Sequence, residues 1–206
     1  MKKCVVGIDE VGRGSLAGPV VVAAVLAPAN SKWLIANGPY ELRDSKKLTP
    51  QKREQWFKYI KSRPEVSFAL ARVYPRRIEK MNISKAANLA AFRAFARLSK
   101  TYNLTPKTSA IYLDGGLYLG KKEYSPSTSS GRITVKTVIR GDEKIKVIMI
   151  ASIIAKVHRD RLMTRLGKIY PKYGFESHKG YGTKAHFRSL KKHGASEAHR
   201  LTFLKK

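Results

Sequence analysis

The chain has 206 residues, of which 43% are hydrophobic, so it is long enough for one domain with a sizeable core. Lys and Arg number 42 against 14 Asp and Glu, a formal net charge of +28 that favours a polyanionic partner, with nucleic acid as the first candidate. Adaptation to an unusual cytoplasm is the alternative explanation of this excess. The single cysteine, Cys4, excludes an intramolecular disulfide and a cysteine-based zinc site.

Strand and helix patterns alternate along the chain. Apolar or alternating runs predict strands at residues 5–8, 20–26, 66–73, 109–113 and 133–139. Helical spacing and capping signals predict helices at 51–61, 83–102, 146–167 and 183–192. A serine-rich stretch at 125–131 predicts an exposed loop. The alternation predicts an α/β fold with a mixed sheet covered by helices.

The helix at 146–167 is expected to change character along its length. Its first half is apolar all round and should be buried, whereas its second half carries Arg159, Asp160 and Arg161 and should be exposed. The segment after Tyr170 has helix and turn signals but no strong strand. We therefore divide the chain into a main α/β domain at 1–169 and a basic helical C-terminal extension at 170–206, which is expected to pack on it and to grip a polyanionic partner.

Three of the five aspartates stand at or just after predicted strand ends. Asp9 follows the first strand, Asp114 the fourth and Asp142 the fifth, and Glu10 adjoins Asp9. Active sites of α/β sheets gather at strand ends, so these carboxylates could converge at one edge. Asp before glycine is also common in turns, and Asp9-Glu10 could be a solvated strand end. Neighbouring side chains of a strand point to opposite faces, so Asp9 and Glu10 meet only if the strand ends or twists there.

Converging carboxylates repel one another, and a divalent cation resolves that repulsion. Oxygen-only ligands suit Mg²⁺ or Mn²⁺. Two such ions, roughly 3.5–4 Å apart, would activate a water and stabilise the leaving oxygen of a phosphodiester. Acids within so basic a chain fit a nuclease better than a purely structural binder, although composition and spacing alone leave both open.

Local motifs narrow the choice. Residues 5–20 read VVGIDEVGRGSLAGPV, and further blocks are DSKKL at 44–48, DG at 114–115, GD at 141–142, ASIIAKV at 151–157 with RDR at 159–161, and HKGYGT at 178–183. Together, and in this order, they closely resemble the ribonuclease HII family over nearly the whole chain. Departures include Ser15, where many relatives have proline, and Gly116 in place of a more usual asparagine.

The resemblance implies a ribonuclease H-like fold with a C-terminal helical extension. It implies four catalytic, metal-binding acids, namely Asp9, Glu10, Asp114 and Asp142, with two Mn²⁺ or Mg²⁺ ions. The substrate-binding residues that we expect are Gly12, Arg13, Gly14, Lys46, Ser177, His178, Lys179 and Tyr181. Asp160, among arginines, is expected to form a structural salt bridge instead.

Each expected contact has a physical rationale and a structural alternative. Glycines let backbone groups approach the 2′-hydroxyl that distinguishes RNA from DNA, but they also suit a tight turn. Arg13 can pair with a phosphate through two hydrogen bonds. Tyr181 can stack on the sugar beside the ribonucleotide, or pack under the glycine-rich loop. Lys46 can meet a phosphate or remain an ordinary solvated lysine.

The predicted activity is metal-dependent hydrolysis of the RNA strand of RNA–DNA hybrids, and of the bond 5′ to a ribonucleotide in duplex DNA, leaving 3′-hydroxyl and 5′-phosphate ends. A non-catalytic nucleic-acid binder and a junction resolvase that cuts all-DNA substrates are the alternatives. The apolar run after Lys2 and Lys3 stops at Asp9, and the run at 147–155 is too short to span a membrane. We expect a cytoplasmic protein, a monomer, with no membrane partner.

Overall fold

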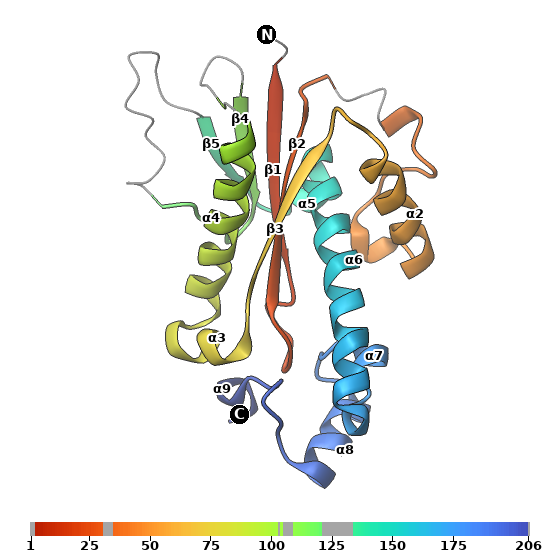
Figure 1. Ribbon diagram of the computed structural model, residues 1–206, viewed down its shortest axis with the longest axis vertical. Coiled ribbons are helices and arrows are strands. Elements are labelled where there is room, and N and C mark those ends of the chain that lie inside the picture. Colours follow the sequence, from red (N-terminus) through yellow and green to blue (C-terminus); the bar gives the residue numbers. More distant parts are fainter. Residues whose placement is uncertain (1–2, 31–34, 103, 105–108, 121–133, 206) are drawn as a thin grey trace.

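A five-stranded sheet forms the centre of the molecule (Figure 1). The computed structural model describes residues 3–30, 35–102, 104, 109–120 and 134–205. The strands are β1 (Cys4–Val11), β2 (Val20–Pro28), β3 (Ser67–Val73), β4 (Ser109–Asp114) and β5 (Thr134–Val138), in the order β3-β2-β1-β4-β5. The pairs β1–β2 and β2–β3 are antiparallel, and β1–β4 and β4–β5 are parallel, which confirms the predicted mixed sheet. The serine-rich stretch 125–131 and residue 133 of the predicted fifth strand lie outside the described residues.

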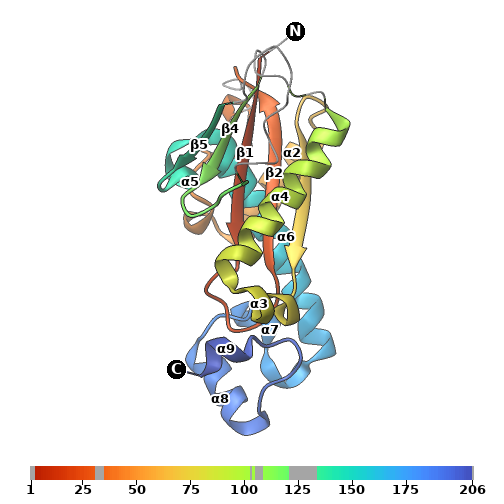
Figure 2. The ribbon, with the colours of Figure 1, turned by 90° about the vertical axis from the view of Figure 1, so that its left-hand side faces the viewer.

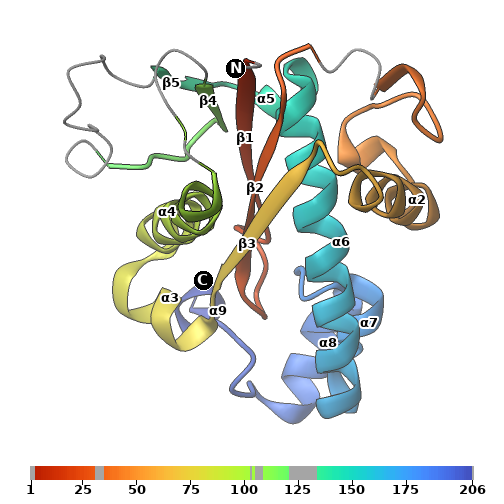
Figure 3. The ribbon, with the colours of Figure 1, turned by 45° about the horizontal axis from the view of Figure 1, so that its top comes forward.

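Helices cover both faces of this sheet (Figure 3). The longer ones are α2 (Pro50–Lys61), α3 (Pro75–Met81), α4 (Ile83–Thr101), α6 (Lys146–Ile169) and α8 (Lys184–His193). Short turns of helix are η1 (Ser45–Lys47), α5 (Gly141–Lys144), η2 (Pro171–Tyr173), α7 (Phe175–His178) and α9 (Leu201–Leu204). Thr49 caps α2 by accepting a hydrogen bond from the Lys52 amide, as the sequence predicts.

Each face of the sheet has its own apolar core. On one face, Val6 and Ile8 of β1 pack with the alanine-rich side of α4. On the other face, residues of β2 pack against α2 and the apolar first half of α6. Gly7 permits the close approach of α6, because a Cβ there would lie 2.5 Å from the backbone of Val147. The two cores fix β1 between α4 and α6, where its last residues reach the site described below.

The C-terminal segment closes the end of the molecule toward which β1 runs (Figures 1 and 2). A third apolar cluster joins Ala17, after β1, to Met163 of α6 and to Tyr173, Phe175 and Ala198 of this segment. The segment therefore packs directly on the loop between β1 and β2. Across the part of the chain that the structure describes, each helix is too short or too polar to cross a bilayer.

The expectation that the second half of α6 is exposed is wrong for one side of the helix. Arg159 is 0% exposed, and Leu162 and Met163 are also buried. The reason is that the C-terminal segment covers this side of α6. Asp160 forms the predicted salt bridge, with its Oδ2 3.3 Å from a terminal nitrogen of Arg53.

Candidate active site

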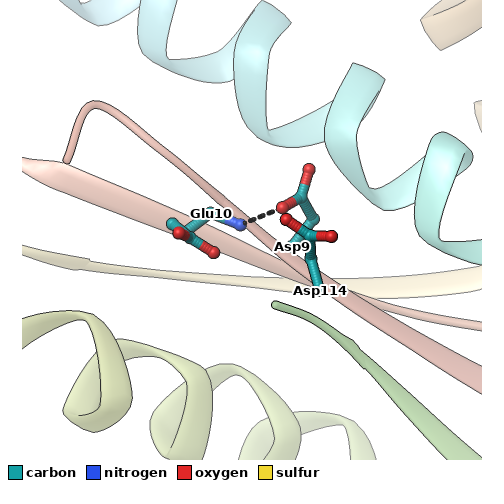
Figure 4. Close-up of side chains that lie close together, drawn as sticks. All are labelled: Asp9, Glu10 and Asp114. Carbon is teal, nitrogen blue, oxygen red and sulfur yellow. Dashed lines mark hydrogen bonds between the residues drawn. The ribbon is translucent and has the colours of Figure 1, made fainter. Parts of the chain in front are cut away.

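Three carboxyl groups meet where β1 passes the end of β4 (Figure 4). Asp9 and Glu10 belong to β1, and Asp114 is the last residue of β4. Each offers a ligand oxygen, and these atoms all lie within 4.8 Å of one another. The backbone amide of Glu10 also donates to the Asp9 carboxylate at 2.8 Å. The parallel pairing of the two strands thus brings residues more than a hundred positions apart to one point.

Asp9 and Glu10 reach this point although both lie within one continuous strand. The strand β1 runs on to Val11, so it does not end at these residues. Its neighbour ends instead: the last pair between β1 and β4 is Ile8 with Leu113. Beyond that pair the edge of β1 is open toward β4, and side chains from both faces can approach the space past the end of β4.

Asp142 lines the same pocket but stands apart from these three acids. It lies in α5, is 4% exposed, and its Oδ2 accepts a hydrogen bond from the Lys46 ammonium at 2.9 Å. Asp114 connects it to the cluster, because its Oδ1 accepts the amides of Gly141 at 2.6 Å and of Asp142 at 3.3 Å. The pocket therefore brings all four predicted acids together, with the fourth held by a lysine.

Burial makes this group of acids electrostatically costly. The pKa of Asp9 is raised well above its usual value, chiefly by burial and then by the charge of Glu10. Burial also raises the pKa of Glu10 to about 7, although the nearby Arg13 acts in the opposite direction. Burial and the charge of Asp142 raise the pKa of Asp114. Such a group of carboxyls is poised to be neutralised by protons or by a cation.

The donor set fits a hard divalent cation. All the candidate ligands are carboxylate oxygens, as Mg²⁺ and Mn²⁺ prefer. In addition, Oε2 of Glu10 is buried and has no hydrogen-bond partner among the described residues. A buried carboxylate oxygen without a partner is unfavourable unless something else binds it. This orphaned atom is the observation that distinguishes the cluster from an ordinary solvated strand end.

The loop after β1 forms one wall of the pocket. The loop residues that line the pocket are Gly12, Arg13 and Gly14, and Tyr181 lines it as well. The pocket has a volume of about 430 Å³. Gly12 has a φ of +87°, so a turn requires glycine there, whereas Gly14 has an ordinary φ and open space around it. The Arg13 guanidinium lies 3.4 Å from Glu10 Oε1 and also donates to Ser84 at 3.1 Å. The Tyr181 ring lies 5.3 Å from the Arg159 guanidinium.

The remaining residues that we predicted to contact the substrate do not all lie in the acid pocket. Lys46 lines the acid pocket. Ser177 and Lys179 line a separate groove, beside Arg161 and Arg165 of α6. His178 is held by the backbone, with its Nε2 2.7 Å from the Tyr173 carbonyl. The structure therefore brings Lys46 to the acids and leaves these other three side chains outside the acid pocket.

Two residues of α6 line the pocket without having been assigned a role from the sequence. These are Ser152 and Lys156, and Ser152 forms a 2.8 Å hydrogen bond with Ser45. Burial lowers the pKa of Lys156. Their spacing was the available signal: two polar residues four apart share one side of a helix that is otherwise apolar there.

Comparison with solved structures defines the class of fold. The chain superposes on ribonuclease H2 from Pyrococcus horikoshii with a TM-score of 0.71 and 24% identity, covering 98% of this chain and 100% of that one. It matches Bst-RNase HIII in complex with Mn²⁺ with a TM-score of 0.69 and 21% identity, over 98% of this chain and 67% of that one. The fold is the α/β ribonuclease H-like fold, as expected.

Sequence comparison identifies the family. The ribonuclease HII family model matches residues 6–206. The chain is 43% identical over 209 residues to ribonuclease HII of Fusobacterium nucleatum, covering 99% of this chain and 87% of that protein. The chain belongs to the ribonuclease HII family, as the motifs predict, and is a metal-dependent hydrolase of the endoribonuclease class.

Proposed function

We propose that this protein hydrolyses the RNA strand of RNA–DNA hybrids and cuts on the 5′ side of ribonucleotides embedded in duplex DNA. The products would carry 3′-hydroxyl and 5′-phosphate ends. The observation that carries the proposal is the meeting of Asp9, Glu10 and Asp114 beside the glycine loop, in a chain with a net charge of +28. The positive charge attracts the nucleic acid, and the three acids concentrate negative charge at one point of this basic chain.

We propose that Asp9, Glu10, Asp114 and Asp142 hold two Mn²⁺ or Mg²⁺ ions. When bound, such ions supply Lewis acidity, which lowers the pKa of a water and neutralises charge that develops on the leaving oxygen. The raised pKa values of Asp9, Glu10 and Asp114 support this assignment, because they express the need for a counter-charge. The Mn²⁺ complex of Bst-RNase HIII, which shares the fold, is consistent with it.

Other residues of the pocket would bind and orient the substrate. Arg13 and Lys46 are two cations of the pocket that pair with its acids, Arg13 with Glu10 at 3.4 Å and Lys46 with Asp142 at 2.9 Å. We propose that a substrate phosphate competes for these cations when the nucleic acid binds. Tyr181, which lines the pocket with the glycine loop, would stack on the sugar beside the ribonucleotide. Ser177, His178 and Lys179 would contact phosphates farther along the duplex.

The decisive experiment uses three duplexes with the purified protein. One carries a lone ribonucleotide, one is an RNA–DNA hybrid and one is all DNA, each incubated with Mg²⁺, with Mn²⁺ or with EDTA. We expect metal-dependent cuts in the first two and none in the third. Binding without cleavage would favour a simple nucleic-acid binder, and cleavage of the all-DNA duplex would favour a resolvase.

Gly14→Ala separates substrate contact from a structural role of the loop. No heavy atom lies within 4 Å of a Cβ built at this position, and φ is ordinary, so the variant should keep its melting temperature. We expect the added methyl to obstruct the ribose and lower kcat/KM on the lone-ribonucleotide duplex by about 10-fold or more, since small misplacements of a reacting group are costly. Normal cleavage by a normally folded Gly14→Ala would remove Gly14 from the substrate site.

We also propose the cellular setting that this activity implies. The protein would excise ribonucleotides that replication leaves in DNA. It would do so in the cytoplasm of its cell and as a monomer. Residues 170–206 would serve as the basic helical extension that grips the duplex. Sedimentation of the free protein and of its complex with a duplex would test the monomer directly.

A further inference from the structure

Two arginines are buried beneath the loop that follows β1. Arg159 of α6 and Arg200, just before α9, are both 0% exposed. Neither lies within 4 Å of a carboxylate in the part of the chain that the structure describes. Charged side chains are almost never fully buried without a partner, so their hydrogen bonds must explain their position.

Their hydrogen bonds go almost entirely to backbone carbonyls of one short segment. Arg200 donates to the carbonyls of Gly12 at 2.7 Å, Arg13 at 2.8 Å and Gly18 at 2.9 Å. Arg159 donates farther along the same segment, to Ser15 Oγ at 2.8 Å and to the carbonyls of residues 17 and 19 at 3.1 Å each, and also to the Lys179 carbonyl at 2.9 Å. The two guanidiniums therefore hold residues 12–19 from within.

The backbone of the C-terminal segment reinforces the same contact. The Gly18 amide donates to the Ala198 carbonyl at 2.8 Å, and the Arg200 amide donates to the Leu16 carbonyl at 2.8 Å. Residue 17 forms an isolated β-bridge with His199. These strand-like backbone contacts hold Arg200 in a fixed position against the loop.

The contacts of Arg200 determine which backbone groups of the loop remain available. A trans peptide is planar, with its C=O and the following N–H pointing in opposite directions. Because the carbonyls of Gly12 and Arg13 point to Arg200, the amides of Arg13 and Gly14 point away from it. Neither amide has a hydrogen-bond partner among the described residues, and both residues line the acid pocket.

We propose that Arg200 is a positioning residue for ribose recognition: it fixes the Gly12 and Arg13 carbonyls so that the amides of Arg13 and Gly14 face the substrate. The inference rests on the proposed function, in which this loop meets the ribose. Burial and the charge of Arg159 lower the pKa of Arg200 to about 9, so the side chain remains a cation at neutral pH. The C-terminal segment thereby fixes the conformation of the loop at residues 12–14, in addition to contributing positive charge.

The test compares two substitutions that keep the charge. Lysine at position 200 has a single ammonium group, which cannot span the three carbonyls that a guanidinium reaches. Arg159→Lys is the matched control, because Arg159 is equally buried and holds the same segment but donates directly to neither the Gly12 nor the Arg13 carbonyl, and reaches the Gly12 carbonyl only through the Ser15 hydroxyl. Both variants should lose stability, so melting temperatures are measured first and cleavage is assayed well below them.

The readouts are kcat and KM on the lone-ribonucleotide duplex and the ratio of Kd values, in EDTA, for that duplex and its all-DNA counterpart. For Arg200→Lys we expect kcat to fall by on the order of 10- to 100-fold, because the donors are misplaced. We expect the preference for the ribose-containing duplex to fall with it, while all-DNA binding is kept. Arg159→Lys should change the Kd ratio much less. Equal effects of the two variants, or an unchanged ratio in Arg200→Lys, would overturn the inference.

Should Arg200→Lys fail to fold, Thr202→Ala tests the same contact more gently. The Thr202 hydroxyl donates to Glu79 of α3 at 2.9 Å and helps to fix the chain that follows Arg200. We expect a few-fold loss of the Kd ratio, and no loss would contradict the inference. If the wild-type protein itself ignores the ribose, the proposed function fails, and this outcome is distinct from a wild-type preference that the variants retain.

Discussion

Two clusters of like charge adjoin the loop of residues 12–14: the acidic cluster is partly buried and is not fully hydrogen-bonded within the described part of the chain, whereas the arginine cluster is fully buried and its side chains have hydrogen-bond partners. Asp9, Glu10 and Asp114 repel one another and leave a buried Glu10 oxygen without a partner among the described residues. Arg159 and Arg200 also carry like charges, but several backbone carbonyls accept their hydrogen bonds. Buried charge that the chain satisfies itself holds structure, whereas buried charge that it leaves unsatisfied is available to bind something from solution.

The largest effect that this comparison predicts follows the removal of one acid. Asp9→Asn should lower the cleavage rate by on the order of 1,000-fold or more, because a neutral amide is a poorer ligand for the ion that supplies the Lewis acidity. The same variant should melt at a higher temperature than the wild type in EDTA, since it relieves repulsion within the cluster. It should also lose the stabilisation that Mn²⁺ gives.

Cleavage assays and thermal melts with and without Mn²⁺ check this prediction. Asp160→Asn is the control, because Asp160 pairs with Arg53 and lies outside the acid pocket. It should keep both its cleavage rate and its response to Mn²⁺. A lower melting temperature of Asp9→Asn in EDTA, with the Mn²⁺ response retained, would mean that the acids are a structural cluster.

Removing a buried cation should have the opposite effect on stability. Arg159→Met leaves the carbonyls of residues 17, 19 and 179 without their donor, and it should cost about 4 kcal/mol of unfolding free energy. Arg161→Met, two positions along α6, removes an exposed side chain paired with Glu54 and should cost about 1 kcal/mol or less. Urea unfolding measures both losses, and similar losses would show that burial of Arg159 contributes little.

The sequence predicted these two clusters unequally. The acids follow apolar strand runs, so their convergence could be inferred from local pattern and from resemblance to the ribonuclease HII family. Arg159 could not be predicted as buried, because an arginine among His158, Asp160 and Arg161 has the pattern of a solvated helix face. The residues that cover Arg159 belong in part to a segment more than ten residues further along the chain. Contacts over such a separation leave no periodic pattern in the local sequence.

Buried histidine and buried carboxyl groups should change the stability of the protein in opposite directions as the pH changes. Burial, and then the charge of His186, lower the pKa of His199 from 6.5 to about 4. Between these values the unfolded chain binds a proton that the folded chain does not, so stability falls as the pH falls. Burial raises the pKa of Glu10 from 4.5 to about 7, so there the folded chain holds the extra proton and stability falls as the pH rises.

These two contributions oppose each other between pH 4.5 and 6.5 in the metal-free protein, and the raised pKa values of Asp9 and Asp114 act in the same direction as that of Glu10. Glu10→Gln in EDTA removes one of the contributions that oppose His199, so the variant should lose more stability than the wild type as the pH falls from 6.5 to 4. Adding His199→Asn should flatten this dependence, whereas adding His193→Asn, at an exposed position, should not. Urea unfolding across the pH range measures it, and a profile for Glu10→Gln that is no steeper than that of the wild type would contradict the prediction.

The smallest expected effect concerns the cation that satisfies part of the acid cluster. Lys46 donates to Asp142 at 2.9 Å, but its side chain is 71% exposed, so the ion pair is worth about 1 kcal/mol at most. Lys46→Met should free the Asp142 carboxylate, and the Mn²⁺ concentration that gives half of the thermal stabilisation should fall by up to about 5-fold. Lys47→Met, next to it, is the control and should leave that concentration unchanged. An increase in Lys46→Met would mean that Lys46 helps the cation to bind, and that the pair with Asp142 does not compete with it.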